Sequence, residues 1–125
     1  MIRGIGIDII EVSRIRAMMR KHPEAFLERV FTQGERDYCS KYKSGTQQYA
    51  ARFAAKEAAM KALGTGLASG IQWTDIEVSH DPQGRPIVLL HGEAAKIAKR
   101  LKIKELQISL THVKSVAVAS VVAVG

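Results

Sequence analysis

The sequence predicts a single α+β domain, residues 1–125, in which a small, mostly antiparallel sheet packs against helices. Three observations lead to this prediction. A length of 125 residues favours one domain over two. Helical patterns occupy most of residues 13–63, whereas strand patterns lie near the N-terminus and dominate the second half. The later strand patterns are separated by short turns, and strands joined in this way pair antiparallel.

The first predicted strand is "GIGIDII", residues 4–10. Because side chains alternate along a strand, Ile5, Ile7 and Ile9 share one face, and two glycines share the other face with Asp8. Glycine leaves room for a close neighbour. We therefore expect another backbone or a ligand to approach this second face.

Four helices are predicted to follow. Ser13 is expected to cap a basic first helix, and Pro23 to end it and open the second. Thr32 and Glu35 have the spacing of a capping box and should begin the third helix, which is expected to run through about Tyr42.

The fourth predicted helix runs from about Gln47 to Leu63. Gly64 follows it as a left-handed C-cap. Alanines at every fourth position, Ala54, Ala58 and Ala62, allow this helix to pack closely, so it is expected at a buried edge or a cleft.

The second half predicts strands at 75–81 and 86–92, an amphipathic helix at 92–103, and strands at 105–113 and 115–125. The last strand is apolar on both faces, so both faces should be covered. Either it is a central strand under a helix, or one face is buried against another copy of the chain.

The composition is basic, with 19 Lys and Arg against 12 Asp and Glu and a net charge of +7. Such a charge attracts nucleic acid, phosphorylated cofactors and acidic proteins alike.

The single cysteine, Cys39, cannot form an intrachain disulfide, which fits a reducing compartment. Cys39 is expected to pack in the core, and the alternative is that it acts as a nucleophile. No stretch is long and apolar enough for a membrane helix, so we expect a cytoplasmic protein that does not bind membranes.

Three side chains suggest chemistry. Asp8 is a carboxylate within an apolar strand, where it needs a partner or a metal unless it caps a loop at the strand end. Glu57 and Lys61 have the spacing of a helical ion pair, and the alternative is a solvated surface pair. Phe53 lies one turn before them on the same line of the helix, which argues against a purely solvated face.

Two carboxylates with nearby cations are typical of a site for Mg²⁺ and phosphate, because Mg²⁺ binds one or two carboxylates together with water and substrate phosphates. Arg52, Lys56 and Lys61 could neutralise the phosphates. The "GTG" of Gly64–Gly66 could bring backbone N–H groups close to an anion.

Two stretches, "GIGIDIIEVSRI" and "RFAAKEAAMKALGTG", resemble the signature sequences of the 4′-phosphopantetheinyl transferases, in the short bacterial class of holo-acyl-carrier-protein synthases. The resemblance extends through "GRP" at residues 84–86 and "SLTHVKSVAVASVV" near the end. It implies the family's fold and reaction: Mg²⁺-dependent transfer of the phosphopantetheine arm of coenzyme A to a serine of apo-acyl carrier protein, which releases adenosine 3′,5′-bisphosphate and supports fatty acid biosynthesis.

The resemblance also implies roles for individual residues. Asp8 and Glu57 match the metal ligands, and Lys61 matches a residue of phosphate contact and catalysis. Pro86 and His112 match positions near the coenzyme, although His112 is also explained as a packed or hydrogen-bonded histidine. The last motif departs from the more common Ser-x-Ser-His by a threonine in "SLTH". The proton acceptor stays open among Glu57, a metal-bound water and a nearby carboxylate, and we favour a water oriented by Glu57.

Partners follow from the same resemblance. Family members of this length are homotrimers with active sites between subunits. Acyl carrier proteins are acidic, and Arg14, Met18 and Lys21 share one face of the first helix, which would suit docking on an acidic, partly apolar helix. The alternative is a solvated basic face with core methionines.

Two other functions remain as alternatives. A small basic nucleic-acid-binding module would explain the charge, but it would leave Asp8 and Glu57 unexplained and it lacks a pattern of stacking aromatics. An inactive subunit that binds coenzyme A is the second, and the intact metal residues argue against it.

Overall fold

A computed structural model describes residues 1–125. Three antiparallel strands form the larger sheet, in the order β1 (Ile2–Glu11), β5 (Val116–Val124) and β4 (Glu105–His112). A separate two-stranded hairpin pairs β2 (Ile76–His80) with β3 (Pro86–Leu90), also antiparallel. The predicted α+β class is therefore confirmed, with the strands divided between two sheets.

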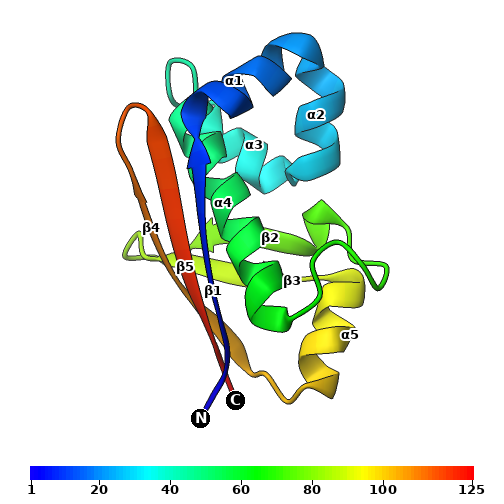
Figure 1. The fold of residues 1–125 in the computed structure, drawn as a ribbon. Helices are drawn as coiled ribbons and strands as arrows, with labels where there is room; N and C mark the ends of the chain where they lie inside the picture. The colour runs from blue at the N-terminus through cyan, green and yellow to red at the C-terminus, as the bar shows by residue number, and fades with distance from the viewer.

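The helices cover one face of the larger sheet. The first three, α1 (Val12–Lys21), α2 (Pro23–Val30) and α3 (Gln33–Cys39), form a cluster at the top of Figure 1. The long central helix α4 (Thr46–Leu63) runs between the three-stranded sheet and the β2–β3 hairpin, and α5 (Gly92–Arg100) lies near the other end.

The ends of these helices follow the predicted signals except at Ser13 and at the end of α3, which stops at Cys39 rather than near Tyr42. Thr32 and Glu35 form the capping box of α3, and Gly64 closes α4 with a φ of 77°. Pro23 opens α2. The prediction for Ser13 is wrong: α1 begins at Val12 after Glu11 and has no side-chain cap, because the chain passes directly from β1 into the helix.

Helix α4 is buried nearly all round, and it packs on β1 more closely than most side chains would allow. A Cβ on Gly6 would overlap the carbonyl oxygen of Ala58, and a Cβ on Gly4 would overlap that of Ala62. The sequence left open whether a backbone or a ligand approaches the glycine face of β1. The structure shows that the backbone of α4 does so. This contact brings Asp8, on the same face of β1, over α4.

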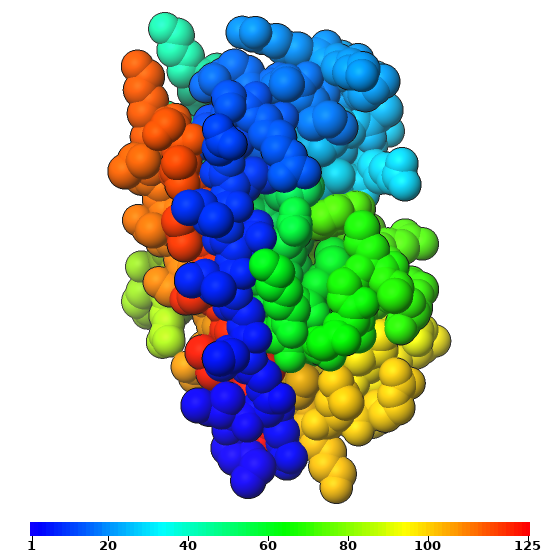
Figure 2. Space-filling model, viewed as in Figure 1, coloured from blue at the N-terminus to red at the C-terminus, as the bar shows by residue number.

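The core lies between α4 and the inner face of the sheet, where Ala117, Ala119, Val121 and Ala123 of β5 are buried. The outer face is not covered within the chain. Ile5, Ile7 and Ile9 are 70%, 63% and 66% exposed. Figure 2 shows the blue side chains of β1 on the surface beside those of β4 and β5. Both faces of β5 were predicted to be covered, but within the chain only its inner face is.

Cys39 is buried in the core, where burial raises the pKa of its thiol to about 12, which favours packing over nucleophilic chemistry. No helix combines the length and the apolar character that crossing a membrane requires.

Candidate active site at the β1–α4 contact

The candidate site lies where β1 crosses the C-terminal half of α4. Asp8 comes from β1, and Glu57 and Lys61 come from successive turns of α4. The Lys61 ammonium lies 3.3 Å from Asp8 Oδ1 and donates a hydrogen bond of 2.9 Å to the carbonyl oxygen of Ile7. The contact thus brings Asp8 next to two side chains of α4 that lie about 50 residues later in the sequence.

The electrostatics of Glu57 show how closely these groups interact. Burial raises the pKa of Glu57, and the negative charge of Asp8 raises it further, whereas Arg14 and Lys61 lower it. Two carboxylates that repel each other in a half-buried site favour binding of a cation between them. Asp8 has a side chain only 13% exposed, whereas that of Lys61 is 55% exposed and is free to turn toward a ligand.

These residues fit a magnesium ion. Asp8 and Glu57 supply carboxylate oxygens, the ligands that Mg²⁺ prefers, and they converge from two elements. Because only two carboxylates meet here, an ion would keep positions for water or for phosphate oxygens. This is the arrangement that Mg²⁺ uses with phosphorylated substrates.

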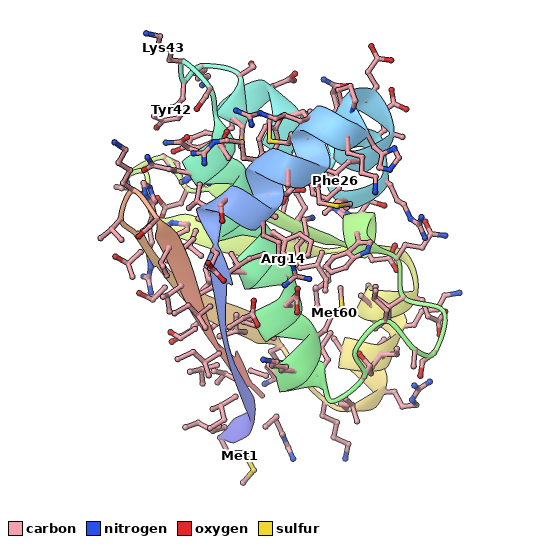
Figure 3. All side chains as sticks on the ribbon, turned by 45° about the horizontal axis from the view of Figure 1, so that its top comes forward. Met1, Arg14, Phe26, Tyr42, Lys43 and Met60 are labelled. Carbon is pink, nitrogen blue, oxygen red and sulfur yellow. The ribbon has the colours of Figure 1, made fainter.

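A cavity of about 360 Å³ opens beside Glu57 and Lys61. It is amphipathic, because both charged and apolar side chains line it. Figure 3 shows Arg14 reaching from α1 toward Met60 of α4. The lining residues are Arg14, Phe53, Glu57, Met60, Lys61, Gly66, Leu67 and Trp73.

A second, apolar cavity of about 250 Å³ lies beside the first and shares Arg14, Phe53 and Trp73 with it. Met18 also lines this cavity and is 39% exposed. Of the three residues expected to bind a partner, two therefore meet here, and Lys21 lies exposed in the last turn of α1.

The residues predicted to contact the coenzyme do not all meet at this site. Gly66 lines the charged cavity, and Gly64 caps the helix just before it. His112 lies exposed at the end of β4, and Pro86 begins β3, where it pairs with His80.

Arg52 faces away from the carboxylates. Its guanidinium lies 4.0 Å from the ring centroid of Tyr38, and it approaches His80 Nε2 at 3.4 Å. Burial lowers the pKa of His80, and the charge of Arg52 lowers it further. His80 and Tyr38 line a third cavity, of about 430 Å³, which also includes Gly84 of the β2–β3 turn.

Lys56 occupies a different place from the one predicted. It is completely buried, 2.7 Å from Glu35, and its ammonium also donates to the carbonyl oxygens of Trp73 and Ile76. All three of its hydrogens are thus used inside the protein, so we do not retain Lys56 as a phosphate ligand. Sequence reasoning missed Trp73, and it identified Glu35 only as a helix cap.

Comparisons with known proteins agree with this geometry. Residues 4–120 match the family model described as the 4′-phosphopantetheinyl transferase superfamily. The holo-[acyl-carrier-protein] synthase of Koribacter versatilis is 46% identical over 122 residues, which cover 98% of each chain.

Solved structures share the fold along the whole chain. The crystal structure of holo-[acyl-carrier-protein] synthase from Neisseria meningitidis has a TM-score of 0.91 at 32% identity and covers 100% of both chains. That of the Bacillus anthracis protein in complex with CoA (3′,5′-ADP) has a TM-score of 0.80 at 42% identity, covering 98% of this chain and 96% of the other.

Proposed function

This chain belongs to the 4′-phosphopantetheinyl transferase superfamily, and from that premise we propose how its own residues carry out the reaction. The reaction is the transfer of the 4′-phosphopantetheine arm of coenzyme A to a serine hydroxyl of apo-acyl carrier protein, leaving adenosine 3′,5′-bisphosphate. The single observation that carries the proposal is the convergence of Asp8, Glu57 and Lys61 beside an amphipathic cavity. Nothing in the comparisons supports the nucleic-acid alternative.

Asp8 and Glu57 would hold a Mg²⁺ ion, which when bound supplies positive charge to the pyrophosphate of coenzyme A. Lys61 would exchange its contact with Asp8 for a phosphate oxygen, and its exposed side chain allows that movement. Its charge would then offset the negative charge that grows on the phosphate in the transition state.

The serine hydroxyl attacks the β-phosphorus and loses its proton. The bond between the β-phosphorus and the oxygen that bridges to the α-phosphate breaks, and adenosine 3′,5′-bisphosphate leaves with that oxygen. We propose that Glu57 orients the water that takes this proton. A carboxylate beside the reacting hydroxyl can hold such a water by accepting a hydrogen bond from it.

Arg14, Met18 and Lys21 are proposed to bind the carrier protein. The supporting observation is that Arg14 and Met18 border the apolar cavity next to the catalytic residues. A carrier protein docked there would present its serine close to Glu57, and its acidic surface would meet the exposed Lys21.

We also propose a homotrimer with active sites between subunits. The exposed isoleucines of β1 share the outer face of the sheet with Val118 and Val122 of β5, and an apolar face of this kind typically marks an interface. His112 and Pro86 lie apart from the carboxylates, so a neighbouring subunit could bring them to the coenzyme. Light scattering should give three times the mass of one chain, and Ile7→Lys should yield monomers; a monomeric unsubstituted protein would refute the proposal.

The cytoplasm is the proposed location, with a role in supplying holo-acyl carrier protein for fatty acid biosynthesis. The one cysteine, buried and unpaired, fits a reducing compartment.

Mass spectrometry of apo-acyl carrier protein tests the reaction. After incubation with this protein, coenzyme A and Mg²⁺, the carrier should gain one phosphopantetheine group, and it should not do so when Mg²⁺ is removed by a chelator. A carrier of unchanged mass under all conditions would refute the proposed function.

A further inference from the structure

A buried pair of charges lies on a different face of α4 from the reacting groups. Neither Lys56 nor Glu35 has any exposed side-chain surface, and their charged atoms lie 2.7 Å apart. Burying two charges removes them from water, and apolar residues of similar volume are often as stable in such places. Stability alone therefore gives little reason for this pair.

The remaining hydrogen bonds of the pair go to backbone groups, of which all but Thr32 N lie in other elements. Glu35 accepts one from Thr32 N and one from Val78 N, each 2.9 Å long, and so joins the start of α3 to β2. Lys56 donates to the carbonyl oxygens of Trp73 and Ile76, and so joins α4 to the short 3₁₀ turn Trp73–Asp75 and to β2. The pair therefore links four segments that meet behind the cavity.

The 3₁₀ turn matters because it carries a wall of the cavity. The Trp73 ring stacks on Phe53 of α4, with centroids 4.8 Å apart and planes at 27°, and both rings line the cavity beside Glu57. Lys56 thus holds the backbone of Trp73 from one face of α4, while the next residue in the helix, Glu57, faces the cavity.

We propose that Glu35 and Lys56 are positioning residues, which hold the Trp73 turn against α4 and thereby fix the cavity wall relative to Glu57. Transfer to a serine depends on close alignment of the reacting groups, and a shift of about 1 Å can cost a large factor in rate. The kinetic consequence depends on the proposed reaction, whereas the position of Trp73 does not.

The chain offers a direct probe, because Trp73 is its only tryptophan. The test variant is the double substitution Glu35→Gln and Lys56→Met, which removes both charges together and leaves neither unpaired. We expect a folded protein in which Trp73 emission moves to longer wavelength, acrylamide quenches it more readily, and kcat per folded molecule falls by about tenfold or more.

Leu106→Ala is the matched control. Leu106 is a core residue of β4 that takes no part in the network, so its truncation lowers stability without releasing Trp73. It should leave the emission spectrum and kcat per folded molecule unchanged. If the double variant does not fold, Glu35→Asp replaces it, because it keeps the charge but shortens its reach. Trp73 emission and kcat per folded molecule are then measured on Glu35→Asp, and both should change in the same direction as expected for the double variant.

The proposal is overturned if a folded variant keeps both the Trp73 emission and the kinetics of the unsubstituted protein. It is also overturned if Leu106→Ala produces the same changes. The fluorescence is measured on the protein alone. Absence of transferase activity in the unsubstituted chain would therefore refute the proposed function, whereas the role of Glu35 and Lys56 in holding Trp73 would still be decided by the fluorescence.

Discussion

Lys61 holds its ammonium nitrogen 3.3 Å from Oδ1 of Asp8, across 53 residues of sequence. The contact joins the helix to the strand at the place where a second carboxylate, Glu57, is already raised in pKa by burial and by Asp8. A cation therefore lies next to the carboxylates even in the protein alone. In the proposed reaction, a metal would take the place of that cation beside Asp8 and leave Lys61 for the phosphate.

Replacing either carboxylate by its amide should remove the metal site and leave the fold intact. Asp8→Asn and Glu57→Gln keep the side-chain shape, so we expect circular dichroism and the unfolding midpoint to change little. Transferase turnover at saturating coenzyme A should fall by about 100-fold or more, the loss typical of a missing electrostatic contact in the transition state. Glu93→Gln on α5 is the control, and near-normal Mg²⁺-dependent turnover in either site variant would contradict the assignment.

The acid limb of the pH profile should report the ionisation of Glu57. The metal-free protein must have Glu57 in its carboxylate form to bind Mg²⁺, so at Mg²⁺ concentrations well below saturation kcat/KM should rise as pH increases through the raised pKa of Glu57. The charge of Arg14 lowers this pKa, so Arg14→Gln should move the limb of kcat/KM to higher pH. Arg16→Gln, which changes an exposed arginine of the same helix, is the control. A limb that stays in place, or moves to lower pH, in Arg14→Gln would refute the role of Glu57.

Charge reversal on α1 should separate carrier binding from coenzyme binding. Reversal at Arg14 should weaken binding of apo-acyl carrier protein, but Arg14 also lines the cavity beside Glu57, so Lys21→Glu is the cleaner variant. Titration calorimetry should show weaker carrier binding for Lys21→Glu and unchanged coenzyme A binding. Lys96→Glu, at an exposed position of α5, makes the same change in net charge and should affect neither. Equal carrier affinity for the two variants would count against the docking surface.

The contact between β1 and α4 should tolerate no side chain at Gly6. The added methyl of Gly6→Ala would overlap the Ala58 carbonyl oxygen, which is backbone and cannot turn aside. We expect the free energy of unfolding to fall by about 2 kcal/mol or more, as for other overpacked cores. Urea unfolding at one protein concentration measures it, with Lys99→Ala at an exposed position of α5 as the control. An unchanged midpoint for Gly6→Ala would show that the two elements are less closely packed than described.

Local signals in the sequence predicted much of this structure. The capping box at Thr32, the left-handed Gly64 and the glycine face of β1 were all readable, because each depends on residues within a few positions of one another. The line of Phe53, Glu57 and Lys61 on one face of α4 also followed from helical spacing. The division into two sheets did not, because it depends on which strands meet after folding.

The error at Lys56 has a physical explanation. Its neighbour Glu57 faces the cavity, but one residue is about 100° of rotation on a helix, so adjacent side chains point in different directions. Lys56 and Arg52 are four residues apart and share a different line from Glu57 and Lys61. That spacing could have separated them, whereas the partner of Lys56, Glu35 on another helix, could not be identified from one sequence.

An anomalous difference map from crystals grown with Mn²⁺, in place of Mg²⁺, and coenzyme A would show directly whether Asp8 and Glu57 hold the metal. We expect a peak between the carboxylates of Asp8 and Glu57, within ligand distance of both and of a pyrophosphate oxygen. Coenzyme A bound with no peak there, or with the metal held by other residues, would contradict it.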